Sequence, residues 1–158
     1  MSEVPHTGDD RVVPIDPDVD RSDRPRAARV QPRVLCAIAA GGALGAPARY
    51  EVAQIIHVAK DTFPWATFWT NVSGSFALGF VLIVVIERFP PTRYLQPFFA
   101  TGFLGAFTTF STMMLELLQM LDAGRLGLAA LYAATSIAGG LAAIALATRL
   151  ARSLASRA

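Results

Sequence analysis

The chain has 158 residues, of which 53% are hydrophobic and only 16% are charged, and its formal net charge is +2. So small a charge does not indicate nucleic-acid binding, and a single cysteine, Cys36, excludes both an intrachain disulfide and a cysteine metal cluster. With only two histidines, neither a catalytic triad nor a zinc site can be assembled, so we expect that the protein is not an enzyme.

The first segment, residues 1–33, is polar and rich in proline. It holds seven of the twelve acidic residues, six of the fourteen basic residues and five of the ten prolines, with almost no apolar periodicity. Such a segment cannot bury enough apolar surface to fold, so we expect a disordered N-terminal tail. Because it lacks the apolar stretch of a signal peptide, the first membrane span would direct the chain to the membrane.

The remaining sequence, residues 34–152, is far more apolar and has room for four membrane spans of about 20 residues each. We predict spans at about residues 34–57, 65–86, 97–121 and 126–150, followed by a C-terminal tail over 153–158. Trp65 and Trp69, at the start of the second span, fit an interfacial aromatic belt. The pattern predicts an all-α membrane protein with four transmembrane helices.

The third span contains a run that is a poor helix former, GFLGAFTTFSTM at residues 102–113. Its two glycines and four hydroxyl residues lower helix propensity, and the hydroxyls compete for backbone hydrogen bonds. In lipid, an irregular backbone is tolerated only where it is buried in protein or lines a wet cavity. The run therefore predicts a break in the third span where an ion is held or moved, as in a transport protein.

Several other polar and aromatic residues within the spans have two readings. Asn71 shares a helix face with Gly74, Ser75 and Leu78, and its amide either bonds a neighbouring helix or donates to an anion. The rings of Phe103, Phe107 and Phe110 would form one helical stripe, which serves packing or holds an anion against positive ring edges. Both readings stay open for these residues.

Charged and hydroxyl residues in the other spans are equally open. Arg49 lies near the far interface of the first span, where it either extends to the headgroups or forms an anion-attracting vestibule. Glu116 is an intramembrane acid, and so a functional candidate, or a polar contact near a helix end. Tyr132 and Ser136 share one face of the fourth span and could donate along a pore or to a neighbouring helix.

Basic residues are distributed unevenly between the two sides of the predicted spans. Counted from Arg24 onward, nine arginines lie on the side of the termini and the second loop, against Lys60 and Arg125 on the other side. By the positive-inside rule, both termini lie in the cytoplasm. The nine are Arg24, Arg26, Arg29, Arg33, Arg88, Arg93, Arg149, Arg152 and Arg157.

Four stretches together resemble a known family of membrane proteins. They are GGALGAPARY at 41–50, TNVSGSFALG at 70–79, TGFLGAFTTFST at 101–112 and YAATSIAGG at 132–140. In this order and spacing they are similar to the motifs of the CrcB-type (Fluc) fluoride channels, and the resemblance covers residues 34–150. It implies a fluoride-specific channel of the plasma membrane that passively exports fluoride from the cytoplasm and relieves its toxicity.

The resemblance also implies an assembly and a set of site residues. The fold would be an antiparallel, dual-topology dimer with a structural, non-transported sodium ion (Na⁺) at its centre, bound by main-chain carbonyls of Gly105 and Thr108. Arg49 would belong to the vestibule, and Glu116 matches a glutamate of the family. The anion pore would be lined by Asn71, Phe110, Thr112, Met113, Tyr132 and Ser136.

Two features of this chain depart from the family pattern. Met113 stands where the family usually has a second phenylalanine, and methionine lacks the positive ring edge. A chain that inserts in both orientations should have balanced basic residues, yet this one is biased nine to two. We therefore hypothesise a fixed orientation and a heterodimer with an oppositely oriented homologue, with a homodimer in the lipid membrane as the alternative.

Two rival functions are also compatible with four short spans. A proton-coupled small multidrug transporter would need a carboxylate deep in the first span, but Glu51 lies near the far end of that span. A non-transporting assembly subunit would use its polar residues only to join helices. In that case, replacing Asn71 or Phe110 would lower stability, and there would be no ion flux to lose.

Overall fold

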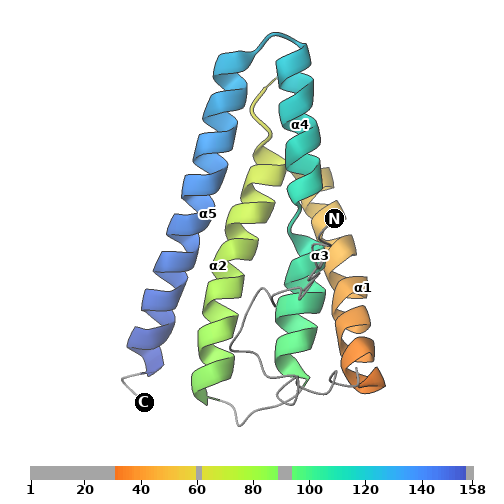
Figure 1. The fold of residues 1–158 in the computed structure, drawn as a ribbon, viewed down its shortest axis with the longest axis vertical. Coiled ribbons are helices and arrows are strands. Elements are labelled where there is room, and N and C mark those ends of the chain that lie inside the picture. The colour runs from red at the N-terminus through yellow and green to blue at the C-terminus, as the bar shows by residue number, and fades with distance from the viewer. Residues whose placement is uncertain (1–30, 60–61, 89–93, 156–158) are drawn as a thin grey trace, which may run out of the picture. The chain divides into compact units, whose positions relative to one another are not determined.

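A computed structural model describes residues 31–59, 62–88 and 94–155 of the chain. Every regular element in this part is helical, which confirms the expected all-α class. The tail expected over 1–33 lies outside the described residues, except for its last three. The elements are α1 (Pro32–Ile55), α2 (Trp65–Arg88), η2 (Pro97–Leu104), α3 (Gly105–Phe107), α4 (Phe110–Asp122) and α5 (Leu126–Ala155) (Figure 1).

Two element boundaries differ from those expected. Helix α1 begins at Pro32 rather than at residue 34, because proline is well suited to the first turn of a helix, where its missing N–H has no partner to lose. Helix α5 continues to Ala155, so residues 153–155 are helical where a C-terminal tail was expected. The last residues, 156–158, lie outside the described part of the chain.

Three helical stretches of the described residues are long and apolar enough to cross a membrane: Trp65–Val84, Pro97–Asp122 and Leu126–Leu154. Helix α1 has 24 residues and is not among them. Its charged residues Arg49 and Glu51, together with its glycines, lower its mean hydropathy. Large apolar side chains on α4 and α5, Leu118 and Leu141 among them, are more than half exposed in the single chain, as expected of surfaces that face lipid or a partner.

Helix α1 packs chiefly on η2 through glycines, and the two run side by side in Figure 1. A Cβ atom at Gly45 would overlap the carbonyl oxygen of Phe103, and one at Gly41 would overlap that of Phe98. Gly102, on the facing helix, would be equally crowded by Ile38. Only glycine lets two helix backbones approach this closely. We call Gly41, Gly45 and Gly102 the glycine seam.

Helix α2 packs chiefly on α5, and α4 also contacts α5. The buried core between α4 and α5 includes Tyr132, which is fully buried, with Met113, Met120 and Ala129. The ring of Phe63 packs edge-on against that of Tyr132, with 5.3 Å between centroids. This core packs α4 against α5 and so fixes the position of α4.

Candidate functional site

The helical backbone stops for two residues between α3 and α4. Thr108 has φ −74° and ψ 156°, and Thr109 has φ −144° and ψ 118°, so both are extended. Threonine is a weak helix former, and its hydroxyl can bond local backbone groups in place of the helix. Upstream, η2 is wound as a π-helix over eight residues, a rare conformation that is frequent at functional sites.

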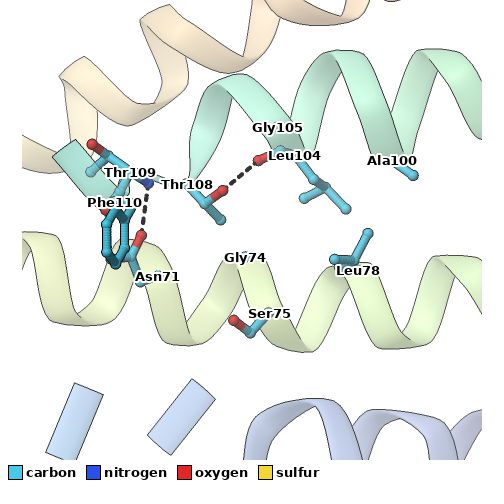
Figure 2. Close-up of a pocket in the computed structure, with 10 residues that line it drawn as sticks. All are labelled: Asn71, Gly74, Ser75, Leu78, Ala100, Leu104, Gly105, Thr108, Thr109 and Phe110. Atoms are coloured by element: carbon cyan, nitrogen blue, oxygen red, sulfur yellow. Dashed lines mark hydrogen bonds between the residues drawn. The ribbon is translucent and has the colours of Figure 1, made fainter. Parts of the chain in front are cut away.

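Asn71 of α2 binds the backbone at this break through both ends of its amide. The N–H of Thr109 donates to Asn71 Oδ1 at 2.8 Å (Figure 2). Asn71 Nδ2 donates to the Thr109 carbonyl at 2.9 Å. Of the two interpretations of Asn71, a hydrogen bond to a neighbouring segment or donation to an anion, the structure therefore contains the first. One N–H of the amide is left over for another acceptor, because an amide nitrogen carries two.

Two backbone donors are diverted from the helix at the break. In a continuous α-helix the N–H of Thr109 would donate to the Gly105 carbonyl, and the N–H of Thr112 to the Thr108 carbonyl. Here the Thr109 N–H donates to Asn71, and the Thr112 N–H donates to Thr109 Oγ1 at 3.2 Å, which caps α4. The carbonyls of Gly105 and Thr108 therefore lose the donors that a helix would give them.

The break opens on a hollow of about 280 Å³ between α2 on one side and η2, α3 and the break on the other. The predicted face of α2 lines this hollow, opposite the residues of the break, and the Phe110 ring lies beside Asn71 (Figure 2). Phe110 is 71% exposed in the single chain. The lining residues are Asn71, Gly74, Ser75, Leu78, Ala100, Leu104, Gly105, Thr108, Thr109 and Phe110.

One turn further along α4, Glu116 joins three helices. Its carboxylate accepts a hydrogen bond from Thr67 Oγ1 of α2 and another from the Tyr132 hydroxyl of α5, each at 2.7 Å. Thr67 and Tyr132 are both buried. Hydrogen bonds to a charged acceptor are roughly twice as strong as neutral ones. The expected candidates Glu116 and Tyr132 are therefore in direct contact.

Two further hollows are lined by residues of this contact. Arg49 and Thr112 line one of about 210 Å³, which Thr67 also borders. Glu116 lines the other, of about 560 Å³, together with Gln119 and Arg125. The Thr67–Glu116 hydrogen bond therefore joins a residue that lines the first hollow to a residue that lines the second.

The comparison with known proteins identifies the family. Residues 36–148 match the family described as "CrcB-like protein, Camphor Resistance (CrcB)". The chain belongs to the CrcB family. It is 45% identical over 124 residues to "Fluoride-specific ion channel FluC 3" of Streptomyces avermitilis, a match covering 78% of this chain and 61% of that protein. It is 46% identical over 120 residues to "Fluoride-specific ion channel FluC 1" of Mycolicibacterium paratuberculosis, covering 76% of this chain and 91% of that protein.

Membership of the CrcB family confirms the resemblance drawn from the four motifs. The relatives are named as ion channels, so the expectation that the protein is not an enzyme is also confirmed. With the three apolar helical stretches, the family makes this a membrane protein. It also excludes the small multidrug transporter, which is a different family.

The remaining candidates for the anion pore differ in burial: Met113 and Ser136 are buried, and Phe110 is exposed. Met113 is buried in the core with Tyr132, whereas Phe110, three residues earlier, is exposed. Ser136 is also buried, and its hydroxyl has no hydrogen-bond partner within the described residues. The phenylalanine stripe is incomplete, because Phe103 and Phe107 stack at 6.0 Å while Phe110 begins a separate helix after the break.

Two residues of the site were not among the candidates from the sequence. Thr67 lies four residues before Asn71, so helical periodicity places it on the same face of α2 and could have identified it. Thr109 was noted only as part of the threonine run, although its side chain caps α4 and its backbone bonds Asn71. Its position, just before an apolar helix, is typical of a capping residue.

Proposed function

We propose that this CrcB-family chain is a subunit of a fluoride-specific ion channel, through which fluoride leaves the cytoplasm passively, so that the toxicity of fluoride to the cell is relieved. The observation that carries the proposal is the identity of 45% over 124 residues and 46% over 120 residues to relatives named as fluoride-specific ion channels. The match spans only 61% of the length of the first of these relatives, but 91% of the second.

The residues around the break suit a small, strongly hydrated anion. A channel for such an ion must replace water with hydrogen-bond donors, and a fixed positive charge would bind the ion too tightly to release it. Neutral donors are available here: the second N–H of the Asn71 amide and the exposed Thr112. On α5, the buried hydroxyl of Ser136 has no partner within the described residues and would offer one more. The exposed ring of Phe110 adds a positive edge.

The resemblance further implies a structural sodium ion, and the residues at the break fit one. The Gly105 and Thr108 carbonyls have lost their helical donors, and carbonyl oxygens are hard ligands that hard cations prefer. The bound cation would supply positive charge that holds together carbonyls which otherwise repel each other. It would be neither transported nor consumed.

Exposed polar groups beside the break support a dimer. Gly105, Ser111 and Thr112 are exposed in the single chain, and backbone and hydroxyl groups at that depth cannot face lipid unpaired. We propose that an antiparallel partner covers this face and supplies further carbonyls to the cation. In this arrangement α1 is the first of four spans of a multi-pass protein of the plasma membrane, and the break at Thr108 lies within the third span.

The partner is either a second copy or an oppositely oriented homologue. The bias of nine basic residues against two favours the homologue, because a chain with a fixed orientation cannot pair antiparallel with itself. Relatives named FluC 2 and FluC 3 both come from Streptomyces avermitilis, so one organism can supply two such chains.

Ion efflux from liposomes containing the purified chain tests the proposal. Fluoride and chloride would each be followed with an ion-selective electrode, and we expect rapid fluoride loss without chloride loss. Flux from the chain alone would support a homodimer, whereas flux only after co-expression with an oppositely biased homologue would support the heterodimer. Absence of fluoride flux in both preparations would contradict the proposal.

A further inference from the structure

Two residues of α2, Asn71 and Gly74, contact the break directly. They are three residues apart, so they lie on the same face of the helix and next to each other along it. Asn71 contacts Thr109, and Gly74 contacts the residue before it, Thr108. Together they touch both extended residues of the break.

Asn71 determines which hydrogen bond the Thr109 N–H makes. A helix would return this N–H to the Gly105 carbonyl, but the Asn71 side chain takes it at 2.8 Å. The same amide donates to the Thr109 carbonyl at 2.9 Å, so it replaces a helical turn with a side-chain clamp. The break therefore needs Asn71 in order to satisfy its own backbone, independently of any anion.

Gly74 makes room for the second residue of the break. A Cβ atom at position 74 would overlap the Cγ2 methyl of Thr108 and would lie 3.2 Å from the Phe107 ring. The Thr108 hydroxyl, on the same side chain, donates to the Leu104 carbonyl at 2.9 Å, so the methyl cannot simply rotate away without losing that bond (Figure 2). A larger residue at 74 would push Thr108 out of its extended position.

We propose that Asn71 and Gly74 are positioning residues that hold the break open, so that the carbonyls of Gly105 and Thr108 stay available to a cation. The role assigned to Asn71 thus extends beyond contact with the conducted anion. The cation part of this inference rests on the proposed function, because it assumes that those two carbonyls bind sodium.

A double-mutant cycle tests the role of Gly74. Gly74→Ala adds the methyl that overlaps Thr108, and Thr108→Ser removes the methyl it overlaps while keeping the hydroxyl. We expect Gly74→Ala to slow fluoride efflux by about tenfold or more, because overpacking of a close-packed interior displaces the neighbouring residues. Adding Thr108→Ser should restore efflux to within about threefold of the Thr108→Ser variant alone, because the two methyl groups would no longer overlap. If positions 74 and 108 did not interact, the effects of the two substitutions would instead add.

The same four proteins would be melted in detergent, once in sodium chloride and once in N-methylglucamine chloride. A bound cation raises the melting temperature of the wild-type chain in sodium by mass action. Gly74→Ala should lose this sodium-dependent rise, and the double variant should recover it. Gly42→Ala is the matched control, because its added Cβ comes no closer than 3.9 Å to any neighbour, and it should behave as wild type.

Asn71→Ala separates positioning from anion contact. Both roles predict loss of fluoride efflux, but only positioning predicts loss of the sodium-dependent rise in melting temperature. A variant that conducts no fluoride and still responds fully to sodium would overturn the inference for Asn71.

The outcomes distinguish this inference from the proposed function. If the wild-type chain conducts fluoride without any response to sodium, the sodium assignment fails, and efflux in the cycle still decides the role of Gly74. If Gly74→Ala matches Gly42→Ala, or if Thr108→Ser rescues nothing, the inference is wrong. If Gly74→Ala yields no folded protein, a folded double variant supports the inference and an unfolded one overturns it.

Discussion

The glycine seam and the hydrogen-bonded region around the break hold helices together in opposite ways. At the seam, Gly41, Gly45 and Gly102 bring α1 and η2 into backbone contact with no side chain between them. Around the break, α2, α4 and α5 are joined by side chains, through the amide of Asn71 and the carboxylate of Glu116. Both kinds of contact suit a membrane protein: small residues let helix backbones pack closely, and polar groups must pair within the protein because lipid offers no water.

The difference separates scaffold from site. The seam has no side-chain donor or acceptor, so it can fix the position of η2 but cannot bind an ion. The hydrogen-bonded region has donors and acceptors, which under the proposed function would exchange a partner for a passing ion. We therefore expect substitutions at the seam to affect folding, and substitutions around the break to affect stability less and ion-dependent behaviour more.

The largest effect should come from the seam. Gly45→Ala drives a methyl group into the carbonyl of Phe103, and backbone cannot give way as a flexible side chain can. We expect a loss of about 3 kcal/mol or failure to fold, measured as the yield of monodisperse protein and its melting temperature. Gly42→Ala is the control on the same helix. Equal behaviour of the two variants would show that α1 and η2 are not packed as described.

Next is the removal of the carboxylate that joins three helices. Glu116→Ala leaves two buried hydroxyls, Thr67 and Tyr132, without their acceptor, at about 1 kcal/mol each. We expect a loss of about 2 kcal/mol in thermal or denaturant unfolding. Glu51→Ala, which removes an exposed acid, is the control and should change little. A silent Glu116→Ala would argue against the bridging role.

A smaller effect is expected from the cap of α4. Thr109→Val keeps the shape of the side chain but removes the oxygen that accepts from the Thr112 N–H, at a cost of about 1 kcal/mol. The released N–H can then return to the Thr108 carbonyl, so the response of the melting temperature to sodium should weaken as well. Thr148→Val, in the middle of α5, is the matched control. An undiminished sodium response would separate the cap from the cation.

The smallest effect should be at Met113. This side chain is buried in the core with Tyr132, and Met113→Leu conserves its volume, so the free energy of unfolding should change by less than it does on loss of the Thr109 cap. Fluoride efflux per folded protein measures its part in conduction. A variant with unchanged stability and lost efflux would mean that the thioether contacts the anion, despite its burial.

Much of this architecture follows from local sequence. The apolar stretches predict helices, and the crowding of glycine and threonine near Thr108 predicts a weak helix, because propensity is a local property. The face that begins at Asn71 was likewise visible from helical spacing, and it lines the hollow at the break.

Other features depend on contacts between distant residues. The bond between Thr67 and Glu116 joins residues 49 positions apart, and nothing near Thr67 in the sequence points to that partner. The burial of Met113 next to the exposed Phe110 depends on how α4 is turned against α5 after the break. The π-helical winding of η2, which packs against α1 at the glycine seam, has no local signature in the sequence.

Phe110→Ile gives the most direct test of the claim that ions pass beside the break while the seam serves only as scaffold. Because Phe110 is 71% exposed in the single chain, its replacement should leave the chain folded. Removing the ring edge should nevertheless abolish fluoride efflux from liposomes, measured per folded protein and compared with Gly42→Ala. Wild-type efflux from a folded Phe110→Ile protein would contradict the account.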